Sequence, residues 1–167
     1  MREMKSLEHG VEGEGEVTKS LVKGMLAGLI GGLVATAAKS VVEKIYPPQA
    51  AGAAEPETVL AEKIAGHRLR GAEGTAATAA IHWGFGALAG AAYGGLAEYF
   101  PAATAKDGAS FGLALATLTQ ETALPAMGLV EEAGEQTVRE QTSEMTSHVV
   151  YGLITETVRR LVRPRLG

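Results

Sequence analysis

Residues 74–97 read GTAATAAIHWGFGALAGAAYGGLA, a stretch of 24 residues without Asp, Glu, Lys or Arg. A helix needs about 20 predominantly apolar residues to cross roughly 30 Å of hydrocarbon. The alternative is a soluble bundle of Ala/Gly-rich helices, but soluble helices of this length normally carry a charged face. Glycine in a soluble helix is also about 1 kcal/mol less favourable than alanine. We therefore favour a membrane-spanning helix for this stretch.

Three further stretches have the same character. Residues 108–130 contain a single charge, Glu121, and residues 24–38 contain none. Residues 145–155 also lack charge, and they reach spanning length only if Glu144 and Glu156 enter the bilayer. Pro125 predicts a kink in the third stretch, because proline removes a backbone hydrogen bond. We predict an all-α protein, an integral membrane four-helix bundle with short loops, with spans at about 21–43, 75–98, 108–130 and 141–162.

The more polar residues divide the chain between these spans. Residues 1–20 are rich in Glu and Gly, which predicts a disordered acidic tail, and they have no apolar core like that of a signal peptide. Pro47 and Pro48 end the first span. Pro56 then opens a small amphipathic helix, which we expect to lie on the membrane surface between spans 1 and 2. The membrane domain covers 21–163, and 164–167 form a C-terminal tail.

Composition excludes several functional classes. The 167 residues include no Cys, which removes disulfides, thiol nucleophiles and Cys-based metal sites. The formal net charge of −4 gives no basic footprint for nucleic acid. No Walker loop, GxSxG or HExxH motif is present. We expect no enzymatic activity, no cofactor and no nucleic-acid partner; the expected partners are the lipid bilayer and either a second copy of the chain or a larger membrane complex.

Small residues recur at four-residue spacing in every predicted span. This spacing lets helix backbones approach closely, which is the main attraction between helices in lipid. Helix packing is the favoured interpretation, and a substrate path lined by glycine is the alternative. The packing residues are Gly24, Gly28 and Gly32 in the first span, Gly86, Gly90 and Gly94 in the second, Gly112 in the third and Gly152 in the fourth.

The distribution of Lys and Arg predicts the orientation in the membrane. With four spans, both termini and the loop at Lys106 share one side, which carries more Lys and Arg than the other. We therefore expect both termini in the cytoplasm of a bacterium, with the chain in the inner membrane. On this inner side, Glu98 and Glu156 can pair with Arg159 and Arg160.

Polar and titratable residues gather in the outer half of the predicted spans. A charge inside hydrocarbon is unfavourable by at least about 2.5–3.5 kcal/mol, so these side chains should face partners or water. They either hold the helices together or bind and relay protons or a small ion. A metal site in the helix core is a further alternative, and its metal is unknown. The candidates are His82, Gln120, Glu121, Glu144, His148, Lys39 and Glu43.

Several separate motifs together resemble a known family. They are Lys39, Glu43 and Pro47-Pro48, Tyr93-Gly94, Ala97-Glu98 through Pro101, the run PAMGL at 125–129, Ser143-Glu144 with His148, and Glu156 with Arg159-Arg160. This combination resembles the YagU-like family of bacterial inner-membrane proteins, built on a domain of unknown function, over residues 20 to 163. The resemblance implies an inner-membrane protein linked to acid resistance, without an established activity. Gln120 stands where the resemblance places a His, which weakens a His-based metal site.

Three hypotheses for the function follow. In the first, a small membrane protein senses or conducts protons or a small ion through its outer cluster, which fits the implied link to acid. The second is a structural or assembly subunit that packs through its glycine ridges. The third is a membrane metalloprotein.

Overall fold

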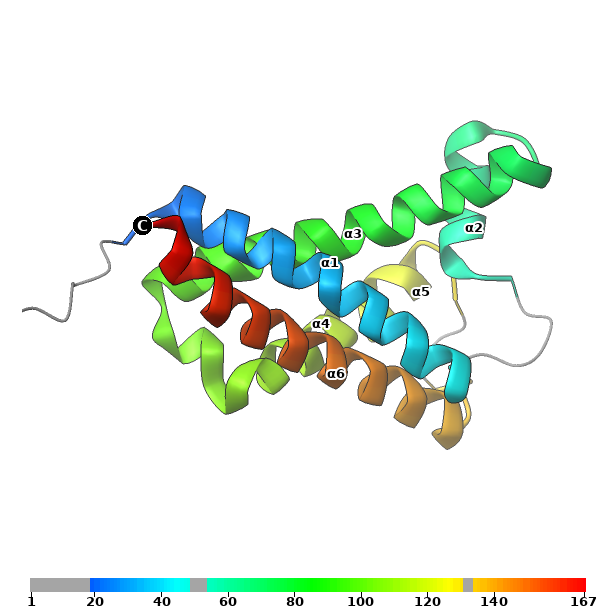
Figure 1. Ribbon diagram of the computed structural model, residues 1–167. Helices are drawn as coiled ribbons and strands as arrows, with labels where there is room; N and C mark the ends of the chain where they lie inside the picture. The colour runs from blue at the N-terminus through cyan, green and yellow to red at the C-terminus, as the bar shows by residue number, and fades with distance from the viewer. Residues whose placement is uncertain (1–18, 49–53, 131–133) are drawn as a thin grey trace, which may run out of the picture.

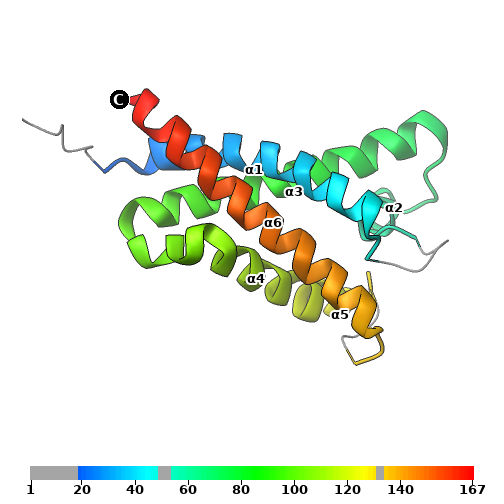
Figure 2. The same cartoon turned by 60° about the horizontal axis from the view of Figure 1, so that its bottom comes forward.

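The computed structural model describes residues 19–48, 54–130 and 134–167, and this part of the chain contains helices and no strand. The predicted all-α class is therefore confirmed. Three long helices, α1 (Leu21–Ile45), α3 (Gly71–Tyr99) and α6 (Val138–Val162), lie beside the shorter α4 (Ala109–Leu118), as Figure 1 and Figure 2 show. The predicted N-terminal tail lies almost entirely outside the described residues.

Local capping signals fix where the helices begin and end. The Ser20 hydroxyl accepts a hydrogen bond from the backbone N–H of Lys23 at the start of α1. Thr137 and Glu140 form a reciprocal capping box that opens α6 three residues before the predicted span. The small helix expected after Pro56 is α2 (Pro56–Ala65), and it ends at Gly66 in the left-handed conformation.

The predicted span 108–130 is helical over residues 109–126, but its hydrogen bonding departs from a regular α-helix near the predicted kink at Pro125. α4 ends at Leu118 and is followed by a wider π turn, η2 (Thr119–Ala123), in which the Leu124 N–H donates to the Thr119 carbonyl. A three-residue helix, α5 (Leu124–Ala126), completes the segment. Pro125 has no N–H to donate, so regular α-helical bonding cannot continue through this turn.

Glycines bring α1 and α3 into backbone contact. The two helices run antiparallel, with Gly24 opposite Gly94, Gly28 opposite Gly90 and Gly32 opposite Gly86. A Cβ atom added to Gly28 would lie 2.1 Å from the carbonyl oxygen of Gly90. Gly112 and Gly152 bring α4 and α6 together in the same way. The glycine ridges are thus used within the chain.

Beyond this ridge α3 leaves α1. Thr36 fills the space against Gly86, and from there towards its own N-terminus α3 diverges from the C-terminal part of α1 (Figure 1). α2 lies in this opening, against α3. We call this the α2 end of the molecule. The opposite end, where α1 begins and α6 finishes, is the termini end.

The termini end closes with a short helix where a tail was predicted. After α6 the chain continues as η3 (Arg163–Leu166), and the Arg163 side chain is buried against α3. At the same end η1 (Pro101–Gly108) connects α3 to α4.

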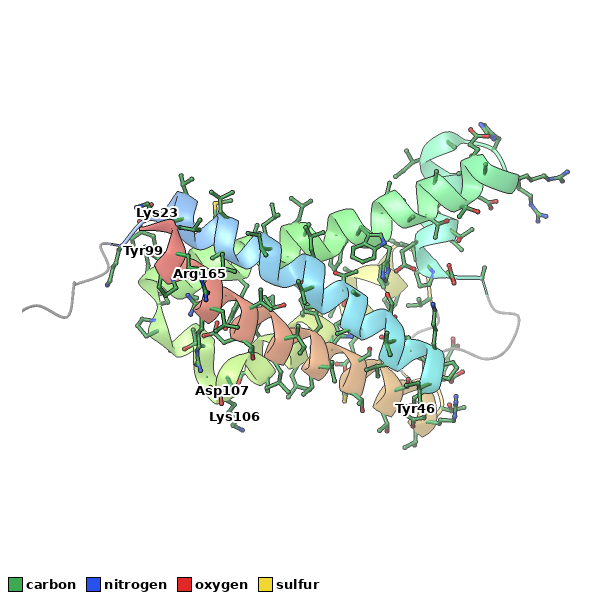
Figure 3. All side chains as sticks on the ribbon, in the orientation of Figure 1. Lys23, Tyr46, Tyr99, Lys106, Asp107 and Arg165 are labelled. Carbon is green, nitrogen blue, oxygen red and sulfur yellow. The ribbon has the colours of Figure 1, made fainter. Side chains whose placement is uncertain are left out.

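Small and polar residues make up the interior. Among the described residues the buried large apolar side chains are Tyr93, Leu129 and Tyr151, while the other buried apolar residues are alanines. Large apolar side chains instead lie on the outside (Figure 3). They include Leu21, Val22, Leu26, Ile30, Val34, Val41, Trp83, Phe85, Leu88, Leu96, Leu113, Leu118, Met145 and Leu161.

By length and composition, α1 is the one helix among residues 19–48, 54–130 and 134–167 that qualifies as a membrane span. The other predicted spans fall short for visible reasons. Most residues of α3 are Gly and Ala, whose small side chains contribute little to its mean hydropathy. The third segment is interrupted at Thr119, and α6 contains many polar side chains.

Candidate functional site

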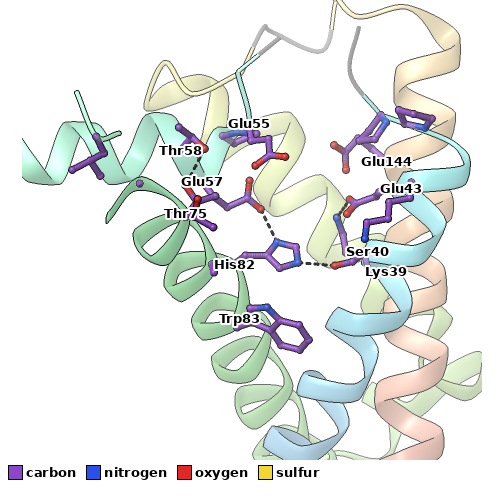
Figure 4. Close-up of a pocket in the computed structure, with 18 of the residues that line it drawn as sticks. Lys39, Ser40, Glu43, Glu55, Glu57, Thr58, Thr75, His82, Trp83 and Glu144 are labelled. Carbon is purple, nitrogen blue, oxygen red and sulfur yellow. Dashed lines mark hydrogen bonds and ion pairs between the residues drawn. The ribbon is translucent and has the colours of Figure 1, made fainter. Parts of the chain in front are cut away.

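A polar cavity occupies the opening between α1 and α3 at the α2 end. Its volume is about 820 Å³, and its wall is formed mainly by the last turns of α1, the start of α2 and the first half of α3, with one residue each from η2 and α6. Four carboxylates, from Glu43, Glu55, Glu57 and Glu144, line this cavity (Figure 4). The arrangement exists because the glycine ridge stops at Gly86, after which larger side chains keep the two helices apart.

A chain of hydrogen bonds crosses the cavity from α1 to α2 through a histidine. The Nε2 atom of His82 lies 2.9 Å from the Ser40 hydroxyl, and its Nδ1 atom lies 2.9 Å from a carboxylate oxygen of Glu57 (Figure 4). The hydroxyls of Thr58 and Thr78 lie 3.0 Å apart and also join α2 to α3. These bonds explain how a short helix is held across the opening.

The environment of Glu57 favours its ionised form. Burial alone would raise the pKa of this carboxyl, but three other interactions outweigh it. The His82 hydrogen bond, a backbone N–H of Glu57 itself and the electrostatic influence of His82 and Lys39 hold the pKa below its usual value. Glu57 is therefore a carboxylate at neutral pH, and its negative charge faces the cavity.

Lys39 and Glu43, one helical turn apart on α1, form an ion pair on the wall of the cavity. Both side chains are mostly buried. The positive charge of Lys39 is therefore balanced by Glu43. The other Lys and Arg side chains of the cavity lining, Lys44 and Arg70, are exposed.

Glu144 and His148 lie on the buried face of α6. The Nδ1 atom of His148 is 2.9 Å from the Glu144 backbone carbonyl and 3.5 Å from its carboxylate oxygen Oε2. Glu144 is only 8% exposed, and Oε2 is buried without a hydrogen-bond partner. A buried acceptor of this kind is unfavourable unless something donates to it. Glu144 lines the polar cavity, on the wall opposite Glu57 (Figure 4).

A second, smaller cavity of about 240 Å³ adjoins the first. Lys39, Glu57, His82 and Gln120 belong to the walls of both. The rest of its wall is mostly apolar and comes from α2, α3 and the segment from Leu115 to Leu129, together with Thr36 of α1 and with His148 and Tyr151 of α6. A polar chamber and an apolar one therefore meet at the same side chains.

The structure brings most of the predicted site residues together. The polar cavity is lined by Lys39, Glu43, His82, Gln120 and Glu144, and His148 lines the apolar one. Glu121 is not part of this group, because its side chain is exposed and lines neither cavity.

Sequence reasoning missed Ser40, Glu57 and Trp83 as parts of the cavity wall. Glu57 lies on the helix that was expected to rest on a membrane surface, and it points to His82 instead. Gly32, Thr36 and Ser40 follow one another at four-residue spacing, and this series leads from the glycine ridge to the wall of the cavity.

An ion-pair cluster closes the termini end. The Glu156 carboxylate accepts from the Nε atoms of Arg159 and Arg160, both at 2.6 Å, and from the Tyr93 hydroxyl at 2.8 Å. Glu98 instead pairs with Arg163, whose Nε lies 3.0 Å from both of its oxygens. Glu98 was expected to pair with Arg159 or Arg160, and its buried ion pair is made with this later residue.

Metal binding finds no support in the described part of the chain. No three His, Asp or Glu side chains there come close enough together to hold a metal ion. Glu144 and His148 form a pair rather than part of such a group.

The fold and the site define a helical protein with a polar interior, an open cavity at one end and a closed ion-pair cluster at the other. The chain belongs to the family described as "Protein of unknown function (DUF1440)", whose sequence model matches residues 33–157. This range includes every predicted cavity residue from Lys39 to His148. No curated protein and no solved structure matches the chain significantly.

Proposed function

We propose that this chain is an integral membrane protein whose polar cavity takes up protons or a small ion from one side of the membrane. The proposal has two parts, a location in the bilayer and a role for the cavity. We propose a binding and relay role rather than an enzymatic one.

The location rests on the inverted distribution of side chains. α6 shows it most clearly: Ser143, Ser147 and Glu156 are buried, whereas Met145 and Leu161 are exposed. In water this arrangement would expose apolar surface and bury polar groups without gain, whereas in lipid both sets of residues are favourably placed. Part of the polar content of α6 therefore faces the interior of the protein, where Ser143, Ser147 and Glu156 are buried.

Threonines on the outer face of α6 support the same location. The hydroxyls of Thr142, Thr146 and Thr157 are exposed, and each donates to the carbonyl four residues earlier at 2.7 Å. Such internal bonds satisfy a hydroxyl where no water is present.

Helix length and charge give an orientation. The 25 residues of α1 extend about 38 Å, which is enough to cross roughly 30 Å of hydrocarbon. Lys23, Lys106 and Arg165 lie at the termini end (Figure 3). The positive-inside rule then favours a cytoplasmic termini end and an outward-facing cavity. The resemblance to YagU-like inner-membrane proteins supports the location in a membrane.

The proton or ion role rests on the buried Glu144 carboxylate at the cavity wall. Its unpartnered oxygen can accept a proton or a cation that enters from the open end. The hydrogen-bonded series Ser40–His82–Glu57 provides further groups that exchange protons along the same wall. An outward-facing site of this kind fits the acid resistance implied by the resemblance.

Flux measurements in proteoliposomes test this role. We expect Glu144→Gln to abolish proton entry driven by external acid, because it removes the proton-accepting group and keeps the side-chain shape. Glu121→Gln is the matched control: it makes the same chemical change on the neighbouring segment, outside the cavity, and should keep wild-type flux. Equal flux in the wild type and both variants would refute the role.

Single-cysteine labelling tests the location, because the native chain contains no Cys. Arg68→Cys, at the exposed turn after α2, should react with a membrane-impermeant maleimide in intact cells. Lys106→Cys should react only after the membrane is permeabilised. Equal labelling of both positions in intact cells would contradict the proposed topology.

The alternative of an assembly subunit was based on the glycine ridges as a contact surface for other chains. The ridges of α1 and α3 face each other, so a role as a subunit would need a different contact surface.

A further inference from the structure

The two adjoining cavities point to a ligand with two chemically different parts. One chamber is lined by carboxylates and other polar groups, and the other mainly by apolar side chains. They share a wall at Lys39, Glu57, His82 and Gln120, so one molecule placed at this boundary would contact both. The volume of the polar cavity, about 820 Å³, is of the size that holds small organic ligands, and the apolar cavity adds about 240 Å³.

We propose that these cavities bind an amphipathic organic cation, a protonated amine that carries an apolar group. The ammonium lies in the polar cavity between Glu144 and Glu57, and the apolar group lies in the second cavity. This inference rests on the proposed function, because it names the class of ion that the same site takes up.

Charge favours a cation over an anion. The carboxylates of Glu43, Glu55, Glu57 and Glu144 outnumber the Lys and Arg side chains of the polar cavity, which are Lys39, Lys44 and Arg70, and the last two are exposed. Glu43 already pairs with Lys39. A fatty acid would bring a further carboxylate into this group, whereas an ammonium would offset the excess negative charge.

Hydrogen bonding favours an ammonium in particular. The Glu144 oxygen Oε2 is buried and has no donor, and the residue that carries it lines the cavity. An ammonium offers three N–H donors, and Glu144, Glu57 and Gln120 supply acceptor oxygens from the lining of the polar cavity. The Glu144 carboxylate can thus accept a hydrogen bond from a molecule that enters the cavity.

The apolar cavity explains why the cation should be organic. Its wall includes Leu60, Ile81, Phe85, Leu115, Leu124, Met127 and Leu129. An inorganic cation would leave this space unused, and the described residues provide no group of three ligands for a metal. An alkyl group would bury its surface there and add affinity in proportion to the area removed from water.

Trp83 provides a direct measurement, because it lines the polar cavity and is the only tryptophan in the chain. Purified full-length protein in lipid nanodiscs is titrated with hexylammonium at neutral pH, without a proton gradient, and Trp83 fluorescence is recorded. We expect a saturable change with hexylammonium. Hexanoate should give none. Methylammonium should bind at least about tenfold more weakly than hexylammonium, because burial of two CH₂ groups already contributes about 1.6 kcal/mol.

Three variants assign the binding to the two cavities. Glu144→Gln should weaken hexylammonium binding by about tenfold or more, since it removes one charge-assisted contact, whereas Glu121→Gln should bind as the wild type does. Ala123→Phe fills part of the apolar cavity, so it should weaken hexylammonium binding and leave methylammonium binding unchanged. Circular dichroism confirms that each variant is folded.

The proposal is overturned if hexanoate binds as tightly as hexylammonium, or if folded Glu144→Gln binds the amine like the wild type. Failure of the proposed function is a separate result. Amine binding without acid-driven proton flux would refute the proton role alone. Proton flux without amine binding would refute the amine ligand and leave the proton role standing.

Discussion

Replacing Gly28 with alanine should separate α1 from α3, although the change adds only one methyl group. The new Cβ would lie 2.1 Å from the Gly90 carbonyl oxygen and 2.7 Å from the Cα of Gly94. Both atoms belong to the backbone of α3, so no side-chain rotation can relieve the contact. Ordinary van der Waals contact begins at 3.4 Å, and the helices must therefore move apart locally by about 1.3 Å.

The size of the effect follows from this separation. A gap of 0.5–1 Å already loses roughly a quarter to a half of the dispersion energy between facing atoms. Overpacking of an interior typically destabilises a protein by about 1–3 kcal/mol. Because the neighbouring glycine pairs of the ridge move with Gly28, we expect Gly28→Ala to lose about 1–3 kcal/mol of folding free energy.

Gly84→Ala is the matched control. Apart from the neighbouring backbone of α3 itself, no atom lies within 4 Å of a Cβ built at Gly84. Both substitutions gain the same helix propensity, of about 1 kcal/mol in a soluble helix. The difference between the two variants therefore isolates the close contact. Equilibrium unfolding in mixed micelles with increasing sodium dodecyl sulfate, followed by circular dichroism, measures that difference.

The result that refutes this reasoning is equal stability of the two alanine variants. It would mean that α1 and α3 do not touch along the glycine ridge. Gly95→Ala refines the comparison, because its Cβ would meet only the flexible side chains of Leu21 and Met25, both at 3.0 Å. We expect Gly95→Ala to lie between Gly28→Ala and Gly84→Ala in stability.

Three further substitutions test the two ends of the molecule. Tyr93→Phe removes a buried donor to Glu156 and should lower the free energy of unfolding by about 1.5–3 kcal/mol. Arg163→Met leaves a buried carboxylate of α3 without its guanidinium partner and should lower it by about 3–5 kcal/mol. Both effects are measured in the same unfolding assay. The carboxyl of Glu57 has a lowered pKa, so its contribution is present above the usual carboxyl pKa and is lost as the pH falls through the folded-state pKa. Acidification should therefore weaken the contact between Glu57 and His82, and we expect this change to appear in Trp83 fluorescence. Glu57→Gln should loosen α2 already at neutral pH and should lack the acid-dependent change in fluorescence.

Different outcomes would contradict these three predictions. Wild-type stability of Tyr93→Phe would mean that the hydroxyl does not bond to Glu156. Arg163→Met should be clearly less stable than Arg165→Met, which changes an exposed arginine of the same turn; equal stability would refute the buried pair. An acid transition that persists unchanged in Glu57→Gln would have to arise from another group.

Much of the fold could be predicted because its signals are local. Missing charge over 74–97, the four-residue glycine spacing and Pro56 each depend on residues near one another in the chain. The helices α1, α3 and α6 begin within four residues of the predicted spans, and α2 is where Pro56 placed it. The third segment was harder to predict. In its π turn a backbone N–H bonds to the carbonyl five residues earlier instead of four, and this small change leaves no clear pattern in the sequence.

The candidate site was only partly predictable. The side chains of Gln120 and Glu121 are adjacent in sequence, yet the first lines both cavities and the second is exposed. The π turn that contains them changes the direction of each side chain relative to a regular helix. Glu121 was selected as a site residue only because it is the one charged residue of its stretch. The sequence does not show which face of this helix is buried.

Residue types thus established a helical chain with small packing residues, polar side chains within apolar stretches and no chemistry based on cysteine. Tertiary packing established where those polar side chains meet. The glycine ridge brings α1 and α3 together only as far as Gly86, and the divergence beyond it creates the cavity. Glu57 enters that cavity because α2 folds back onto α3. Such placements depend on contacts between residues far apart in the chain, and local sequence patterns carry no record of them.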